Sequence, residues 1–195
     1  MRRNWLVFTI LLIGLAALWA RATDRREELK GFLRNFFLKL SRVDSIRDSR
    51  RKESELMALV SRDIDLDWIA NFILGRHGKG IDGGQRRQFI ELYSKYLASS
   101  YGSTLSIYRG NNYEFVSVEK QREGIFLVST VVQFNDKKVK NSFRIVEKDG
   151  KFHITDVMVE GISFIAAKRA DLNSIIVSKG FDGFLEELRM KNGSN

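Results

Sequence analysis

The residues of this chain that could perform acid–base chemistry gather in its last third. Asp156 and Glu160 lie four residues apart in the stretch DVMVEGISF, and His153 precedes Asp156 by three residues. A carboxylate within reach of a histidine is a common arrangement for proton transfer. On an extended strand, however, residues three apart point to opposite faces, so we expect no catalytic pair from His153 and Asp156. Asp156 and Glu160 pass from strand into turn, where no regular spacing makes them an acid–base pair.

A glycine-rich stretch, GRHGKG, carries the other histidine, His77. Gly75 and Gly80 have the spacing of a phosphate-binding loop, but Ile81 and Asp82 stand where lysine and serine or threonine are required. With two histidines and no cysteine in the chain, no nucleophile, base and orienting group can be assembled. We therefore predict a connecting loop here and no catalytic residues. The alternative is that Arg76 and Lys79 of this loop contact a phosphate head group.

The first residues have the pattern of an export signal. Two arginines precede an apolar stretch over residues 6–19, and Ala20 and Ala22 are the small residues that a signal peptidase recognises. The apolar stretch is shorter than the roughly 20 residues needed to span a bilayer. We predict that residues 1–22 are a signal peptide cleaved after Ala22, and that residues 23–195 form the exported protein. The alternative is that the stretch stays uncleaved as a membrane anchor.

Composition limits what the exported part can be. Its length suits a single domain with its own core. The absence of cysteine excludes disulfides, thiolate metal sites and acylation as a lipoprotein. The formal net charge of +9 includes three arginines of the leader, and the other basic residues are interleaved with acids. This charge gives no reason to expect a nucleic-acid partner, and it suits contact with anionic lipid surfaces or acidic partners.

Helical patterns occupy the first half of the chain. Apolar residues recur every three or four positions from Asp24 to Val43, as on one face of an amphipathic helix. The charged segment RDSRRKESE is typical of a solvated helix, and DLDWIANFILG of a short helix closed by Gly75. Asp82 and Gln85 can cap the next helix. The apolar positions of that helix are unusually aromatic: Phe89, Leu92, Tyr93, Tyr96 and Leu97.

Four β-rich segments, separated by turn residues, follow from Tyr113. A further helical pattern comes after them and can pack against the sheet. We predict an α+β fold in which a twisted, antiparallel, four-stranded sheet is covered on one face by helices.

The Asp149-Gly150 pair predicts the register of the last two strands. As a two-residue hairpin turn, it would place Ile145 opposite Ile154, and Phe143 opposite Asp156. We predict for the preceding turn that Phe134 lies opposite Val139. One face of the sheet is then apolar and carries Phe126, Val128, Thr130, Val132, Phe143, Ile145 and Ile154.

The end of the chain, DVMVEGISFIAAKRADLNSIIVSKGFDGFLEEL, resembles the C-terminal signature of the MlaC family, also called the toluene-tolerance family, which comprises periplasmic phospholipid-binding proteins of Gram-negative bacteria. The matching positions are Asp156, Val157, Glu160, Gly161, Ser163, Arg169, Gly180 and Leu185. The middle of the chain agrees at Leu74, Gly75, Arg76, Gln85, Arg86, Phe89, Leu97, Tyr101 and Tyr108. Phe152 and Gly78 depart from the family pattern, because tryptophan is common there, and so does Lys168, where a tyrosine is usual.

The resemblance implies a phospholipid carrier and not an enzyme, with an NTF2-like cone and a lipid cavity between sheet and helices. Phospholipid would be the cargo, and no cofactor is implied. The residues expected to line the cavity are Phe89, Tyr93, Tyr96, Leu97, Tyr101, Phe126, Val128, Thr130, Val132, Phe143, Ile145, Ile154, Met158, Ile162 and Phe164. Glu160 and Gly161 would form the corner at the cavity rim, with Asp156 at its mouth.

The resemblance also implies a cellular location and partners. We expect a monomer in the periplasm that moves lipid between the outer and inner membranes and so maintains outer-membrane lipid asymmetry. The implied partners are an inner-membrane ABC transporter complex with an MCE-domain subunit and an outer-membrane lipoprotein complex. Two alternatives stay open: a cone-fold periplasmic enzyme that uses Asp156 as a base, and a membrane-tethered interaction module held by an uncleaved leader.

Overall fold

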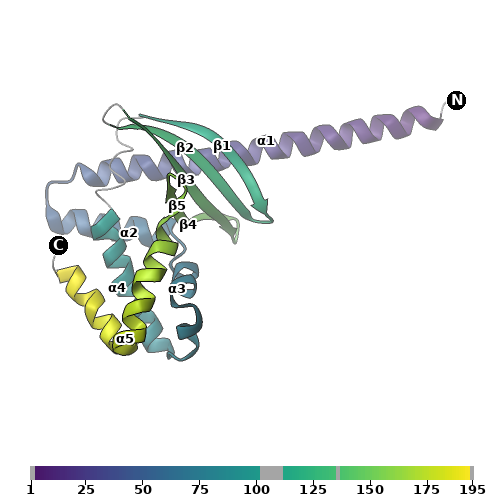
Figure 1. Ribbon diagram of the computed structural model, residues 1–195. Helices are drawn as coiled ribbons and strands as arrows, with labels where there is room; N and C mark the ends of the chain where they lie inside the picture. The colour runs from purple at the N-terminus through teal and green to yellow at the C-terminus, as the bar shows by residue number, and fades with distance from the viewer. Residues whose placement is uncertain (1–2, 102–111, 135–136, 194–195) are drawn as a thin grey trace.

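The computed structural model packs an antiparallel sheet against a group of helices, with one long N-terminal helix running along the sheet (Figure 1). It describes residues 3–101, 112–134 and 137–193, with the backbone alone at residues 3–23, 100, 101 and 134. The architecture is α+β, as the sequence predicts. The helices are α1 (Arg3–Asp44), α2 (Ser49–Asp63), α3 (Leu66–Leu74), the 3-10 helix η1 (Gly75–Lys79), α4 (Gly83–Tyr101) and α5 (Phe164–Gly193).

The predicted helix boundaries on either side of the glycine-rich loop are confirmed. Gly75 follows the last residue of α3 with a φ of 49°, a conformation that glycine adopts more readily than other residues. At the start of α4, Asp82 Oδ1 accepts a hydrogen bond from the Gln85 N–H at 2.8 Å, and Gln85 Oε1 accepts one from the Asp82 N–H at 3.1 Å. This reciprocal pair is a capping box.

Helix α5 consists of two helical segments joined at Gly180. The φ of 71° and ψ of 178° at this residue are not helical, and they lie in a region open almost only to glycine. The chain changes direction there (Figure 1). The second segment packs along α4, where Asn192 Nδ2 donates to the Leu92 carbonyl at 3.0 Å. Gly180 therefore allows one continuous stretch to contact α4 twice.

The sheet is a meander of five strands, one more than predicted, in the order β1-β2-β3-β4-β5. The additional strand is β5, which pairs Ile162 and Ser163 with the end of β4. It forms because Glu160 and Gly161, with φ of 49° and 82°, turn the chain back before α5 begins. The strands are β1 (Tyr113–Arg122), β2 (Ile125–Phe134), β3 (Lys137–Lys148), β4 (Lys151–Val159) and β5 (Ile162–Ser163).

The β3–β4 hairpin follows the predicted register for only part of its length. Asp149 and Gly150 both have positive φ, as a two-residue hairpin turn requires, and Ile145 lies opposite Ile154. The prediction that Phe143 lies opposite Asp156 is wrong. A bulge inserts Thr155 into β4, so that Asp156 pairs with Arg144 and Phe143 with Val157.

The β2–β3 pairing is also shifted from the prediction, by two residues. Val139 lies opposite Val132, and Phe134 opposite Lys137, because the strands extend closer to the turn than expected. Side chains alternate with a period of two, so an even shift leaves the same residues on each face. The seven residues predicted to share one face are all buried. We call this side of the sheet the inner face and the other the outer face.

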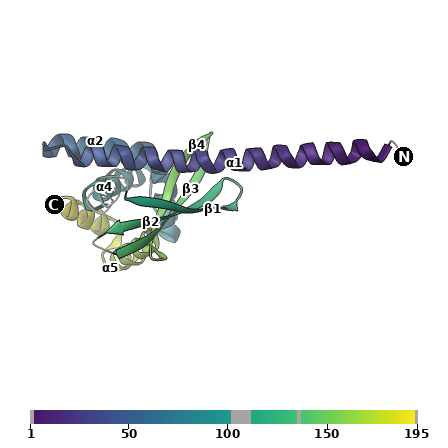
Figure 2. The ribbon, with the colours of Figure 1, turned by 90° about the horizontal axis from the view of Figure 1, so that it is seen from above.

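Buried apolar residues form two clusters. The sheet cluster joins the inner face to α1, α2 and one residue of α4: Leu29, Leu33, Phe36, Phe37, Leu40, Val43, Leu56, Leu59, Val60, Ala98, Phe126, Val128, Val132, Phe143, Ile145 and Ile154. The helix cluster joins α3, α4 and α5: Ile69, Ala70, Ile73, Leu74, Phe89, Tyr93, Tyr96, Ile165, Leu172, Ile176, Phe184, Leu185 and Leu188. Figure 2 shows α1 lying along the sheet.

Candidate functional site

The inner face is covered by α1, which supplies most of the side chains that pack on it. The Phe37 ring of α1 lies 5.4 Å from the Phe143 ring and 4.8 Å from the Tyr113 ring. Phe37 and Phe143 are each no more than 1% exposed. The periodic apolar residues from Asp24 to Val43 therefore find their partner in the sheet.

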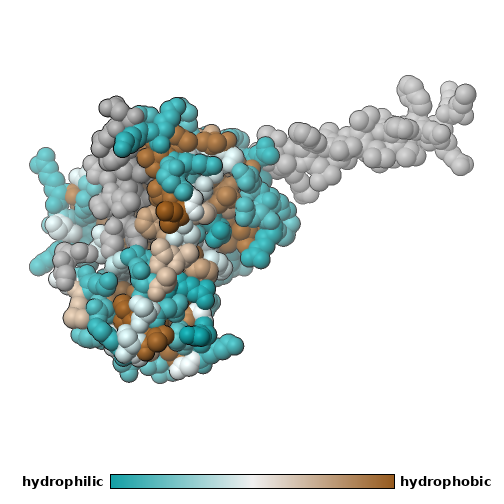
Figure 3. All heavy atoms as spheres, viewed as in Figure 1, coloured by the Kyte–Doolittle hydropathy of each residue, from teal (hydrophilic) through white to brown (hydrophobic). Residues whose placement is uncertain are grey.

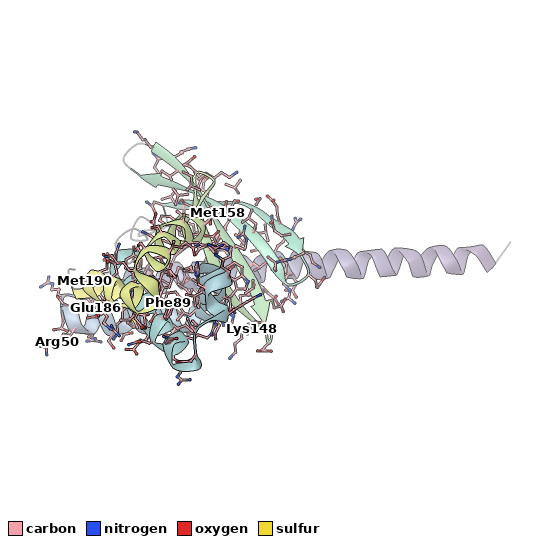
Figure 4. All side chains as sticks on the ribbon, turned by 60° about the horizontal axis from the view of Figure 1, so that its bottom comes forward. Arg50, Phe89, Lys148, Met158, Glu186 and Met190 are labelled. Carbon is pink, nitrogen blue, oxygen red and sulfur yellow. The ribbon has the colours of Figure 1, made fainter. Side chains whose placement is uncertain are left out.

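The aromatic residues of α4 were expected to line a cavity against the sheet, but they do not cover the inner face. Phe89, Tyr93 and Tyr96 belong to the helix cluster, and the Phe89 ring contacts Phe184 of α5 at 5.5 Å. Figure 4 shows Phe89 among the helices and Met158 at the sheet. The expected lining residues are thus divided between two cores. Nothing in the spacing along α4 distinguishes a helix partner from a sheet partner.

Ile64 and Leu97 connect the two cores. Both are partly buried and pack against the sheet cluster and against the helix cluster. Ile64 also forms a bridge with Ile154 of β4, and the next residue, Asp65, donates its N–H to the Ile154 carbonyl at 3.0 Å. We call Ile64 and Leu97 the cluster junction.

Three other expected lining residues do not belong to the buried part of the inner face. Met158 pairs with Ser142 and Ser163, which places it on the outer face. Ile162 pairs with Val159 on the side of the inner face but is 69% exposed, and Phe164 is half-buried at the start of α5. Figure 3 shows hydrophobic residues gathered on the visible side of the molecule over the strands. The side chain of Tyr101 lies outside the described residues.

Asp156 of β4 contacts the start of α5 and is buried, with 2% of its surface exposed. Its Oδ2 accepts a hydrogen bond from Ser163 Oγ at 2.7 Å, and its Oδ1 accepts one from the Ile165 N–H at 3.4 Å. Burial raises the pKa of the Asp156 carboxyl above its usual value, while these hydrogen bonds and the nearby Arg144 charge oppose the rise. The carboxylate therefore ties the sheet to α5, and the expectation that it lies at a cavity mouth does not fit its burial.

The prediction that His153 and Asp156 point to opposite faces of the sheet is wrong. His153 lies opposite Val146, and Asp156 opposite Arg144, so the bulge at Thr155 brings both onto the same side of the sheet. The hydrogen-bond partners of Asp156 are nevertheless on β3, β5 and α5, and His153 Nδ1 is buried without a partner among the described residues. The pair still forms no catalytic dyad, for this reason and not for the one predicted.

Glu160 and Gly161 form the corner between β4 and β5. Glu160 Oε1 accepts a hydrogen bond from the Lys140 N–H at 2.6 Å, and the Glu160 N–H donates to the Lys140 carbonyl at 2.9 Å. The carboxylate thus continues the β3 ladder past the end of β4. Its part in this structure is to shape the turn.

Two further positions from the family pattern contact each other. A Cβ added at Gly75 would lie 2.8 Å from Arg169 Nη2, and the Arg169 guanidinium lies 4.9 Å from the centre of the Phe72 ring. Glycine at residue 75 leaves room for the arginine. The adjacent Lys168 reaches Tyr96 of α4, and the hydrogen bond with the tyrosine raises the pKa of Lys168.

Two polar pairs lie across β2 and β3, one on each face. On the outer face, Ser129 Oγ and Ser142 Oγ form a hydrogen bond of 2.9 Å. On the inner face, Asn141 lies opposite Thr130. Asn141 is 1% exposed, and neither Nδ2 nor Oδ1 has a hydrogen-bond partner among the described residues. Asn141 was not among the predicted site residues, although its position two residues before Phe143 on the same strand marks it as inward-facing.

The described residues contain no group of three or more His, Cys, Asp or Glu side chains arranged to hold a metal ion. Within the part of the chain whose side chains are described, no helix is both long enough and apolar enough to cross a membrane.

The family model described as "MlaC protein" matches residues 34–190. The chain belongs to the MlaC family. Its fold is also similar to a solved structure, the phospholipid-binding protein from Ralstonia solanacearum in complex with a phospholipid. The TM-score is 0.71 at 14% sequence identity, over 84% of this chain and 96% of that one. The resemblance found in the sequence motifs is therefore confirmed at the level of the family and the fold.

Proposed function

We propose that this protein binds a phospholipid and carries it through the periplasm between the outer and inner membranes. The observation that carries the proposal is membership of the MlaC family over residues 34–190. The fold shared with a solved phospholipid-binding protein supports it. An uncleaved leader would tether the protein, so the proposal also rests on the predicted cleavage after Ala22. Sequencing the mature N-terminus tests that step, because a freely moving carrier should begin at Thr23.

The task of such a carrier is physical and needs no catalysis. Two acyl chains carry roughly 30 methylenes, and at about 0.8 kcal/mol each their exposure to water costs about 24 kcal/mol. Free diffusion between membranes is therefore negligible. The protein has only to offer an apolar environment about as favourable as a bilayer, because a much tighter site would retain the lipid.

We place the acyl chains at the cluster junction, next to the inner face. Ile64 and Leu97 are only partly buried and touch both cores. Separating the clusters there leaves each one packed. Entry into the middle of either cluster would instead displace fully buried rings such as Phe143 or Phe89, which costs more.

Family membership also supports the expected partners. We propose that the protein receives or delivers lipid at an outer-membrane lipoprotein complex and at an inner-membrane ABC transporter complex with an MCE-domain subunit. Work at the transporter can supply the free energy needed to release the lipid. Site-specific crosslinking in cells tests these contacts, and a chain that crosslinks to neither complex would contradict this part of the proposal.

A pair of tryptophan variants on α4 tests the position of the site. Leu97→Trp adds bulk at the junction, whereas Leu92→Trp makes the same change at a residue of the same helix that packs against the helix cluster alone. We expect Leu97→Trp to lower the co-purified phospholipid several-fold and Leu92→Trp to leave it near the wild-type level. Equal lipid content in both variants, with both folded, would contradict this placement.

A further inference from the structure

The side-chain amide of Asn141, on the inner face of β3, is buried in a way that the fold does not explain. It is 1% exposed, and both its donor and its acceptor lack partners among the described residues. Burial of an unsatisfied amide destabilises a protein. At the neighbouring residue pair of the same two strands, on the outer face, Ser129 and Ser142 form a hydrogen bond with each other. Asn141 therefore requires another explanation.

The surroundings of Asn141 in the sheet are neutral and mostly apolar. On the inner face its neighbours along β3 are Val139 and Phe143, and those across the ladder are Thr130 and Val159. These four offer a single hydroxyl. The same neighbours carry no charge, so the site does not suit a bare phosphate, whose burial needs a cation. It suits a neutral oxygen acceptor.

We propose that Asn141 Nδ2 donates a hydrogen bond to an ester carbonyl oxygen of the bound phospholipid. The inference rests on the proposed function and adds to it the polar contact that orients the lipid. From Asn141 the inner face continues along β3 through Phe143 to Ile145, a distance of about 13 Å. Ile145 pairs with Ile154, which bridges to Ile64 at the cluster junction. Asn141 and the junction therefore lie on one face of the sheet, within the length of a single acyl chain.

The ester group itself provides the test. The delipidated full-length protein is offered two vesicle preparations, one of dipalmitoyl phosphatidylglycerol and one of the dihexadecyl ether analogue, which has the same headgroup and chain length but lacks the carbonyl oxygens. We expect the wild type to retain the ester lipid about fivefold better, the factor expected for one net hydrogen bond. Asn141→Leu, which removes the amide and nearly preserves volume, should lose this preference. Ser142→Ala removes a hydroxyl from the outer face and should keep it.

The outcomes separate the inference from the function on which it rests. A wild type that retains neither lipid would overturn the proposed function and this inference with it. A wild type that retains both lipids equally would overturn the assignment of Asn141 alone, and this comparison does not depend on the folding of any variant. If Asn141→Leu keeps the ester preference, the carbonyl contact lies elsewhere. Lipid-free Asn141→Leu should melt at or above the wild-type temperature, because it no longer buries an unsatisfied amide.

Discussion

The sheet cluster and the helix cluster solve the burial of large side chains in different ways. In the helix cluster, rings pack on rings, and Tyr96 at its edge contacts Lys168. The sheet cluster packs α1 on the inner face with equally buried rings, and the buried Asn141 amide on that face has no hydrogen-bond partner among the described residues. We infer that the helix cluster is a structural core, and that the sheet cluster is a core that also serves a ligand.

The largest effects should come from removing one ring in each cluster. Phe89→Ala and Phe143→Ala each leave a cavity and should lower the free energy of unfolding by about 3–5 kcal/mol. Because we place lipid beside the inner face, bound lipid should restore part of the lost free energy of unfolding in Phe143→Ala and none of it in Phe89→Ala. Denaturant titrations of lipid-loaded and lipid-free protein measure this difference. Equal recovery in both variants would contradict the claim that the two clusters differ in their contact with lipid.

The next largest effect concerns the direction change inside α5. Gly180→Ala places a Cβ on a residue with φ of 71° and ψ of 178°, and we expect a loss of about 1–3 kcal/mol. Since nothing lies within 4 Å of the added Cβ, the cost is conformational and not steric. Gly193→Ala, near the end of the same helix and also in open space, is the control. Comparable melting temperatures for the two variants would contradict this account of Gly180.

A smaller effect should appear in the pH dependence of stability. Burial raises the pKa of Asp156 in the folded protein above its usual value, so its proton is held more tightly in the folded state than in the unfolded state. This contribution favours folding below the unfolded-state pKa and is lost as pH rises through the folded-state pKa. We expect the wild type to lose stability relative to Asp156→Asn as pH rises across this window. A pH-independent difference in the free energy of unfolding would be the contrary result.

The smallest effect is predicted for His153→Ala. The His153 side chain is half-buried, and its Nδ1 makes no hydrogen bond among the described residues. Its removal should change stability by about 0.5 kcal/mol or less and leave the amount of bound phospholipid unchanged. Lipid extraction from the variant and the wild type checks this. A marked loss of lipid in a folded His153→Ala protein would give the histidine a role that its contacts do not suggest.

Local chemistry explains what could be predicted from the sequence. The capping box at Asp82, the helix end at Gly75 and the hairpin at Asp149-Gly150 depend on neighbouring residues, and all three are confirmed. The composition of the inner face also follows from alternation along the strands. The family assignment came from motif residues and is confirmed by the family model.

Contacts between distant segments explain what could not be predicted. The bulge at Thr155 shifts β4 by one residue without any glycine to signal it, and it places His153 and Asp156 on the same face of the sheet, contrary to the prediction. Likewise, the row of aromatic residues on α4 could pack against a sheet as well as against a helix. Its contact with Phe184 of α5 depends on the change of direction at Gly180. The two clusters therefore could not be separated from the pattern alone.

The most direct test of the central claim is native mass spectrometry of the protein after expression of the full chain in a Gram-negative host and purification from the periplasm without detergent. We expect a species heavier than the polypeptide by the mass of a phospholipid, and a diacyl glycerophospholipid in the organic extract of the same sample. A protein that shows the polypeptide mass alone, and that takes up no lipid when incubated with phospholipid vesicles, would contradict it.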